Sequence, residues 1–171
     1  LHISTAEELA LFEAGPVEGK RITAETCVHF LRFARPDYAE RGNFIKCNPS
    51  IKEPSDRAAL LRAIAEDRID VLATDHAPHT LEEKQQPYLT APSGLPLVQD
   101  FVVAALECVH EGHFGLERFV RKSCHNPAVR FSILTATTTR MRTMMIRKLH
   151  RLSALIPMCN SSNGTHPCTV R

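Results

Sequence analysis

The sequence predicts an α/β fold built on a parallel sheet, and three observations carry this prediction. Over residues 1–133, short β-like runs alternate with helical patterns, as in successive βα units. Polar side chains that can perform chemistry follow directly after two of the predicted strands. The composition, 43% apolar and 23% charged over 171 residues, is that of a soluble globular protein. The length suits one domain or a part of a larger one.

The first predicted elements are a helix and two short strands. The run Ser-Thr-Ala-Glu at 4–7 has the form of a capping box, and it opens a helix through about residue 12. A short β-like run covers residues 21–25. Residues 43–47 are the next strand candidate, which the Asn-Pro pair at 48–49 stops.

A helix and a strongly apolar strand follow. Ser55 or Asp56 caps a helix that runs through about residue 67, with leucine and isoleucine at helical spacing. Residues 69–73 form a strand that is apolar enough to be buried on both faces of a sheet. This order of strand, polar residues and helix predicts parallel strand pairing.

The elements after this strand are a loop and then helices. A polar loop extends from residue 79 to about residue 96. Within it, Glu82, Glu83 and Lys84 are interpreted as a solvated helix face. Apolar residues at helical spacing predict a helix over 97–111, a second helix covers 115–123, and His125 to Pro127 begin one more.

Residues 134–171 differ from the rest of the chain in pattern and in charge. They show no burial period, and they carry six basic residues and no acidic one. We expect this segment to be disordered or non-native. A basic tail can also indicate nucleic-acid binding, but no aromatic residues are interleaved with the basic ones, which argues against it. The chain starts with Leu1 and not with methionine, and we expect a cut or incomplete sequence.

Cysteine usage and hydropathy predict a cytoplasmic protein. The six cysteines form no CxxC pair and no regular spacing, which is typical of reduced thiols. No apolar run is long enough to cross a membrane, and the start shows no signal peptide. A metal site in this chain would therefore take its ligands from histidine and carboxylate side chains.

The strongest local signal for function is the run Thr-Asp-His-Ala-Pro-His at 74–79, at the end of the predicted strand 69–73. The Asp75 carboxylate could bind a metal ion through one oxygen and accept a proton through the other. This makes Asp75 the best catalytic candidate. The alternative is a loop-fixing or helix-capping aspartate followed by two surface histidines.

Two other residues occupy comparable positions. His2 comes just before a capped helix, where a strand could end, and imidazole is a common zinc ligand. Asn48 precedes a proline and is usually just a turn residue, although its amide could pair with a substrate carboxylate or amide. The remaining histidines have weaker claims: His29, His110, His113 and His125.

Four motifs, taken together and in order, resemble the dihydroorotases of the amidohydrolase superfamily. The resemblance runs from Leu1 to about Ile133. The motifs are LHIST at 1–5, IKCNPSIK at 45–52, ATDHAPHTLEEK at 73–84 and APSGLP at 91–96.

The resemblance implies that the chain is the C-terminal part of a TIM-like (β/α)₈ barrel, with room for about three of the eight units. His2 would end the sixth strand as a zinc ligand. Asp75 would end the eighth strand, where it would bind zinc and carry the proton.

The resemblance also implies a substrate site. Asn48 would end the seventh strand and bind substrate, and His79 would hold the substrate carboxylate. Ser93 and Gly94 would touch the ring through backbone groups.

The implied reaction is the reversible cyclisation of N-carbamoyl-L-aspartate to dihydroorotate in pyrimidine synthesis, with two zinc ions in the complete site. The family's other metal ligands lie on strands that this chain lacks, so the chain alone is expected to be inactive. The implied partner is the small-molecule substrate, with no membrane, and a homo-oligomer is left open. A hydantoinase- or allantoinase-type amidohydrolase and a non-catalytic truncated homologue are the alternatives.

Overall fold

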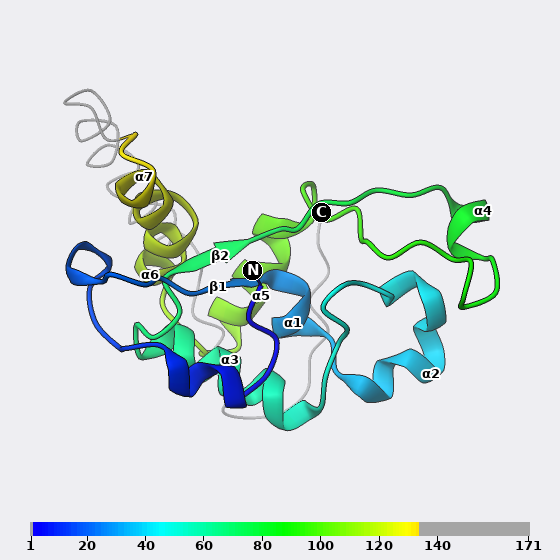
Figure 1. The fold of residues 1–171 in the computed structure, drawn as a ribbon, viewed down its shortest axis with the longest axis horizontal. Coiled ribbons are helices and arrows are strands. Elements are labelled where there is room, and N and C mark those ends of the chain that lie inside the picture. The colour runs from blue at the N-terminus through cyan, green and yellow to red at the C-terminus, as the bar shows by residue number, and fades with distance from the viewer. Residues whose placement is uncertain (1, 134–171) are drawn as a thin grey trace, which may run out of the picture. The chain divides into compact units, whose positions relative to one another are not determined.

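The computed structural model describes residues 2–133 of the chain (Figure 1). The predicted tail at 134–171 lies outside the described residues. The fold of the described part is α/β, as predicted.

The described part contains two strands, joined by helices of different types. The strands are β1 (Glu25–Cys27) and β2 (Val71–Ala73). The α-helices are α1 (Val28–Arg32), α2 (Tyr38–Arg41), α3 (Pro54–Ala65), α4 (Leu81–Lys84), α5 (Phe101–His110), α6 (Leu116–Val120) and α7 (Asn126–Arg130). The 3-10 helices are η1 (Glu7–Leu11), η2 (Val17–Gly19), η3 (Arg35–Asp37) and η4 (Gly42–Ile45), and a π-helical turn, η5 (Arg121–His125), connects α6 to α7.

The strands are parallel, and a third segment runs beside them. β1 pairs with β2 in the register Glu25 to Val71 and Cys27 to Ala73. His2 forms a parallel bridge to Glu25, and the Ile3 amide donates a 2.7 Å hydrogen bond to the Glu25 carbonyl. The segment at His2, then β1, then β2 thus lie side by side and in parallel, so their carboxyl ends meet at one edge.

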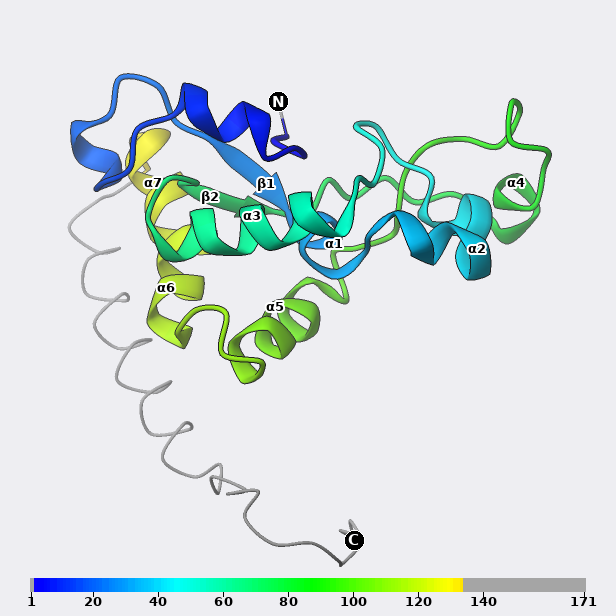
Figure 2. The ribbon, with the colours of Figure 1, turned by 90° about the horizontal axis from the view of Figure 1, so that it is seen from below.

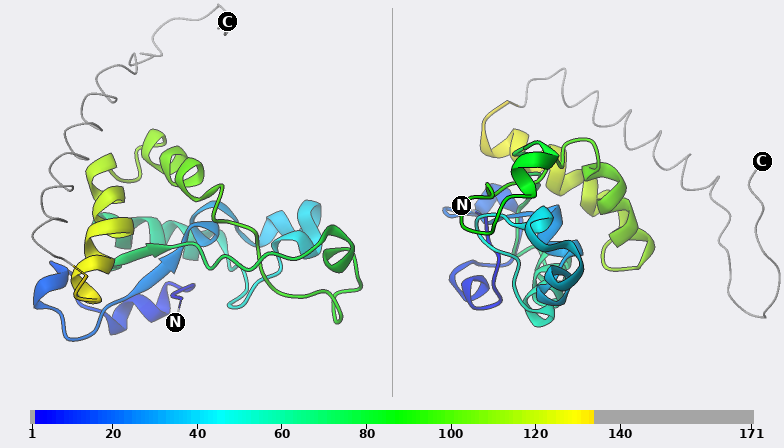
Figure 3. Two further views of the ribbon diagram at one scale, coloured as in Figure 1. Left: turned by 90° about the horizontal axis from the view of Figure 1, so that it is seen from above. Right: turned by 90° about the vertical axis from the view of Figure 1, so that its right-hand side faces the viewer.

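Helices α1, α3 and α5 form one core with the strands. The buried cluster joins Phe30 and Leu31 of α1, Leu60 and Ile64 of α3, and Cys108 of α5. Figure 2 shows α3 alongside the β1–β2 pair, and Figure 3 shows α5, α6 and α7 following one another on another side of it. The helices α2 and α4 lie toward the same end of the described part, away from α7 (Figures 1 and 2).

The first two predicted elements are shifted along the chain. The capping box is formed by Thr5 and Glu8, one residue later than predicted: the Thr5 amide donates to Glu8 Oε2 and the Glu8 amide donates to Thr5 Oγ1. It opens η1, a 3-10 helix, and not an α-helix. The strand predicted at 21–25 overlaps β1 only at Glu25: the buried residues are Ala24, Thr26 and Cys27, whereas Ile22 is 69% exposed.

The strand predicted at 43–47 is wrong. This segment contains η4, and its backbone bonds to a loop and not to a strand: the Lys46 carbonyl accepts the Gly94 amide at 2.9 Å. Asn48 therefore does not end a strand of the described sheet. The strand between His2 and β2 is β1, which leads directly into α1.

The later predictions hold with changed bounds. Helix α3 begins at Pro54, and the Asp56 carboxylate accepts the Glu53 amide at its start. The helix predicted at 97–111 is α5, and the predicted short helix begins at Asn126 as α7. The predicted polar loop at 79–96 contains the helix α4, which the Thr80 side chain caps.

Two apolar elements are partly exposed, although the strand at 69–73 was predicted to be buried on both faces. In β2 only Leu72 is fully buried, while Val71 and Ala73, which point to the opposite face, are partly exposed. On α5, Val102, Val103 and Leu106 are 50%, 60% and 41% exposed. The periodicity identified these elements correctly, but nothing among the described residues covers these faces.

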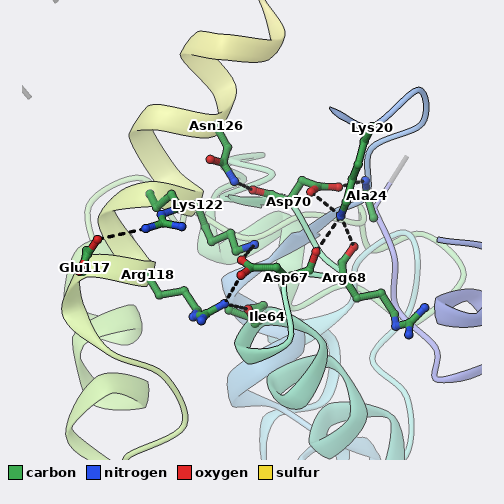
Figure 4. Close-up of polar contacts among 11 residues, drawn as sticks. Lys20, Ala24, Ile64, Asp67, Arg68, Asp70, Glu117, Arg118, Lys122 and Asn126 are labelled. Atoms are coloured by element: carbon green, nitrogen blue, oxygen red, sulfur yellow. Dashed lines mark hydrogen bonds and ion pairs between the residues drawn. The ribbon is translucent and has the colours of Figure 1, made fainter. Parts of the chain in front are cut away.

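Charged side chains are buried where β2 begins (Figure 4). Asp70 is 1% exposed; its Oδ1 accepts Lys20 Nζ at 2.7 Å and its Oδ2 accepts the Ala24 amide at 2.9 Å. The Asp70 carbonyl accepts Asn126 Nδ2 at 2.8 Å. Every polar group of Asp70 therefore has a partner from another part of the chain.

Asp67 forms a second ionic cluster just before this strand (Figure 4). Its carboxylate contacts Lys122 Nζ at 2.6 Å and Arg118 Nη1 at 2.7 Å. Burial acts to raise the pKa of Asp67, but the hydrogen bonds and charges of Lys122 and Arg118 outweigh it and lower the pKa. This cluster ties the helical run from α6 to α7 to the turn that precedes β2.

Among the described residues, no helix has both the length and the apolar character needed to cross a membrane.

Candidate active site

His2 and Asp75 meet at the carboxyl edge of the parallel strands. His2 Nε2 lies 3.4 Å from Asp75 Oδ1, although the two residues are far apart in sequence. Their side chains are 23% and 30% exposed, so solvent and small molecules can reach them. The two residues predicted as metal ligands are thus brought together by strand pairing.

The other ring nitrogen of His2 is held by β1. Glu25 Oε1 lies 2.7 Å from His2 Nδ1, and Cys27 Sγ lies 3.2 Å from the same nitrogen. A carboxylate on one imidazole nitrogen orients the ring and makes the opposite nitrogen a better metal ligand. Glu25 was not singled out from the sequence, because its role depends on the register that places it opposite His2.

The backbone turns sharply at Asp75. Its φ of 49° lies in the left-handed region, which aspartate tolerates better than most residues. The Thr74 hydroxyl accepts the His76 amide at 3.2 Å and supports this turn. The turn directs the Asp75 carboxylate back toward His2.

Two buried thiols, Cys27 and Cys47, lie close enough to Asp75 for its charge to affect their pKa values. Burial, together with the negative charge of Asp75, raises the pKa of Cys47 to about 11. Burial also raises the pKa of Cys27, with contributions from Glu25 and Asp75. Both thiols are therefore protonated at neutral pH. The four described cysteines, Cys27, Cys47, Cys108 and Cys124, are unpaired, as predicted.

His29 is a residue near the site that sequence reasoning ranked low. It is 1% exposed, and neither ring nitrogen has a hydrogen-bond partner in the described part of the chain. Burial lowers the pKa of His29 to about 4, with Asp75 opposing the change and His2 adding to it. No sequence pattern singles out His29, and only the fold shows that it is buried near His2 and Asp75.

His79, Ser93 and Gly94 form a second cluster, also at this end of β2. His79 Nε2 lies 3.2 Å from the Ser93 carbonyl, and His79 Nδ1 lies 3.7 Å from Glu83 Oε2. The Ala77 amide donates to the Leu95 carbonyl at 3.0 Å, which lays the loop beside the chain that leaves β2. The three predicted substrate contacts are therefore neighbours.

Gly94 has no room for a side chain. Its φ is 143°, and a Cβ added there would lie 2.5 Å from the Ala77 carbonyl oxygen and 3.1 Å from His79 Nε2. The loop can approach Ala77 this closely only because residue 94 is glycine.

The structure leaves Asn48 outside both clusters. Its side chain is exposed and makes no hydrogen bond among the described residues. Cys47, its neighbour, is close enough to Asp75 for that charge to affect its pKa. Asn48 thus follows a segment that reaches the site, but this structure shows no contact between Asn48 and the other candidates.

Lys84 is buried, and its interpretation as part of a solvated helix face is wrong. Glu82 and Glu83 are exposed as predicted, but Lys84 is only 6% exposed. Its ammonium donates to the carbonyls of Lys46, Pro92 and Gly94. Charge patterning alone could not distinguish it from a solvated lysine.

Within residues 2–133, no group of three or more histidine, cysteine, aspartate or glutamate side chains is arranged to hold a metal ion. His2 and Asp75 can supply two ligands, one nitrogen and one oxygen.

Known proteins resemble this chain in sequence. Over 132 residues it is 37% identical to a dihydroorotase from Halobacterium salinarum, an alignment that covers 77% of this chain and 30% of that protein. It is 35% identical to a dihydroorotase from Enterococcus faecalis over 139 residues, which are 81% of this chain and 33% of that protein. The chain is a relative of the dihydroorotases. It spans about a third of the length of these curated relatives. No family model matches it.

Solved structures also resemble the described fold. An L-hydantoinase (dihydropyrimidinase) from Arthrobacter aurescens aligns with a TM-score of 0.70 and 26% identity, over 77% of this chain and 30% of that one. A dihydroorotase from Saccharomyces cerevisiae in complex with 5-fluoroorotic acid aligns with a TM-score of 0.68 over 80% of this chain and 38% of that one. Its 17% identity supports a shared fold alone. Thus the sequence relatives are dihydroorotases, while the fold is common to dihydroorotases and hydantoinases.

Proposed function

We propose that this chain is part of a zinc-dependent dihydroorotase, which interconverts N-carbamoyl-L-aspartate and dihydroorotate in cytoplasmic pyrimidine synthesis. The observation that carries the proposal is the convergence of His2 and Asp75 at the carboxyl edge of parallel strands, 3.4 Å apart. Active sites of (β/α)₈ enzymes are built at this edge. The 37% identity to a dihydroorotase favours this reaction over others on the same fold.

The fold supports a barrel that other strands complete. Among the described residues, β2 pairs with β1 on one side only, and one face of β2 is partly exposed at Val71 and Ala73. In a closed barrel this face would pack against side chains from the other strands. We therefore assign residues 1–133 to the C-terminal portion of the barrel, with His2, β1 and β2 as its sixth, seventh and eighth strands.

Zinc fits the two residues that the chain supplies. The donor set of one imidazole nitrogen and one carboxylate oxygen suits this ion, and Glu25 supports the imidazole from behind. When bound, zinc ions polarise the amide carbonyl and make water a better nucleophile at neutral pH. Because no third ligand is present among residues 2–133, the pair should bind zinc only weakly without the rest of the site.

The residues of the chain take the following roles in the proposed reaction. Asp75 accepts a proton from the attacking water and delivers it to the ring nitrogen as the amide bond breaks. In the direction of cyclisation, Asp75 takes the proton from the carbamoyl nitrogen. The partly exposed position of its carboxylate allows this transfer.

The second cluster, formed by His79, Ser93 and Gly94, would bind the substrate together with Asn48. The His79 imidazole and the Asn48 amide would hold the substrate carboxylate, and backbone groups of Ser93 and Gly94 would contact the ring. The Ser93 carbonyl holds the His79 ring from one side, which limits its rotation. Asn48 would have to turn toward the site when substrate binds.

A hydantoinase-type activity is the second candidate. The observation that favours it is the TM-score of 0.70 and 26% identity to an L-hydantoinase. A third reading, a non-catalytic truncated homologue, follows from the two-ligand site. These three proposals share one fold and differ in the substrate, if any, that the protein hydrolyses.

The test uses the chain alone and the longer polypeptide to which we propose it belongs. Purified chain 1–171 should contain zinc well below one equivalent and should hydrolyse nothing. The longer polypeptide should hydrolyse dihydroorotate, and Asp75→Asn should reduce kcat by about 10²–10⁴-fold because it removes the proton carrier. The exposed Asp100→Asn is the matched control and should leave kcat unchanged. Turnover of hydantoin or allantoin without dihydroorotate would overturn the proposal.

A further inference from the structure

Lys84 is a buried cation that no step of the proposed reaction uses. It ends the helix α4 and is 6% exposed. Its Nζ lies 3.1 Å from the Lys46 carbonyl, 3.0 Å from the Pro92 carbonyl and 2.9 Å from the Gly94 carbonyl. The partners belong to two chain segments that are distant in sequence.

These two segments carry the proposed substrate contacts. Lys46 is two residues before Asn48, and Pro92 and Gly94 flank Ser93. The segments are also joined directly, since the Gly94 amide donates to the Lys46 carbonyl at 2.9 Å. Lys84 thus completes a connection between the loop at 92–94 and the segment that leads to Asn48.

All three N–H donors of the Lys84 ammonium are used within the protein. An ammonium group has three N–H donors, and Lys84 has three backbone carbonyl acceptors around it. No donor remains for a substrate carboxylate, so direct contact with the substrate would cost one of these bonds. Replacing the ammonium by an apolar group would leave buried carbonyls without partners.

A nearby lysine holds a different part of the loop. Lys46 Nζ donates at 2.6 Å to the carbonyls of both Tyr88 and Ala91, and it lies over the Tyr88 ring. These partners precede Ser93 and Gly94 in the loop. Lys84 alone of the two ammonium groups bonds to the residues that flank Ser93.

We propose that Lys84 is a positioning residue, which holds the loop at 92–94 against the segment leading to Asn48 and so sets the groups that meet the substrate. The assignment of those groups rests on the proposed function. Lysine suits the position because three carbonyls converge on one point, whereas the donors of arginine lie in a plane.

The first test uses the chain itself. In Lys84→Met, hydrogen exchange of the Gly94 amide should accelerate at least tenfold, because the bond from Gly94 to Lys46 loses its support. Lys52→Met is the matched control: within residues 2–133, Lys52 Nζ donates only to Ser50, and exchange at Gly94 should not change. Unchanged exchange in Lys84→Met would overturn the proposal.

A second measurement needs no variant and decides the question if Lys84→Met does not fold. The Lys84 ammonium of the wild-type chain should give a ¹H–¹⁵N signal that is protected from exchange with water. Lys52 should give no such signal. A Lys84 ammonium that exchanges as fast as that of Lys52 would also overturn the proposal.

The longer polypeptide separates positioning from a charge effect. In Lys84→Met, KM for dihydroorotate should rise about tenfold or more with a smaller change in kcat, and Lys84→Arg should not restore it. Full restoration by arginine would show that charge and not position matters. If the polypeptide acts on hydantoin alone, the proposed function fails, while exchange at Gly94 still tests the role of Lys84.

Discussion

The aspartates at the two ends of β2 differ in their burial and in their hydrogen bonds. At the end where the strand begins, Asp70 is 1% exposed and both of its oxygens accept hydrogen bonds from Lys20 and Ala24. At the end where the strand stops, Asp75 is 30% exposed, and its contact is an imidazole nitrogen 3.4 Å away. Only four residues lie between these two aspartates, yet the first is fully paired and the second is partly exposed.

Burial and pairing distinguish a structural carboxylate such as Asp70 from a candidate catalytic carboxylate such as Asp75. A buried charge must be fully paired, and its groups are then not free for chemistry. A carboxylate that the fold exposes and leaves with unused acceptor capacity contributes little to stability but can bind a metal ion or a proton. The left-handed backbone at Asp75 is consistent with this, because local strain tends to collect at functional sites.

The difference between Asp70 and Asp75 can be tested by removing the charge of each carboxylate in turn. Asp70→Asn should lower the free energy of unfolding by about 3–5 kcal/mol, because it leaves the Lys20 ammonium buried without its carboxylate. Asp75→Asn should change it by less than about 0.5 kcal/mol, as expected for a partly exposed group. Urea denaturation of the two variants and the wild-type chain measures both values. Equal losses would show that the two ends do not differ as described.

Burial of His29 predicts how the free energy of unfolding depends on pH. Its pKa falls from 6.5 in the unfolded chain to about 4 in the fold, chiefly because of burial, and this gap corresponds to about 3 kcal/mol. Between these values the unfolded chain binds a proton that the folded chain does not. Stability should therefore fall as the pH drops from about 7 to 4 and should not fall further below 4 on account of this group.

The control for this prediction is His29→Leu, which removes the titrating group. Both ring nitrogens lack partners among the described residues, so leucine leaves no hydrogen bond unmade. Unfolding monitored at several pH values should show a flatter profile for the variant between pH 6.5 and 4. An identical profile in both proteins would place His29 in contact with solvent.

Gly94 tests the loop at the end of β2 that carries the candidate site. Gly94→Ala should cost about 1–3 kcal/mol, because an alanine Cβ would strain the backbone and meet the Ala77 carbonyl. Gly112→Ala is the matched control, since Gly112 also has a positive φ, of 81°, but open space around its Cβ position. The difference between the two melting temperatures isolates the close approach. No difference would mean that the loop moves away from Ala77 at little cost.

Sequence reasoning succeeded where short-range patterns carry the information. The apolar run at 69–73 contains β2, and the spacing at 56–67 identified α3. It failed at 43–47, where the β-like pattern is a 3-10 helix. The hydrogen bonds of that segment go to Gly94 and Lys84, and no local pattern encodes partners so distant in the chain.

By itself the sequence determined the class of fold, the relation to the dihydroorotases and the identity of Asp75 as the principal candidate. Only the tertiary structure decided that His2 faces Asp75, that Glu25 supports the His2 ring, and that Lys84 is buried under the loop at 92–94. The reason is physical. Residue type and spacing determine local backbone preference and chemical capability, whereas strand register and burial determine which groups meet and which remain free to react.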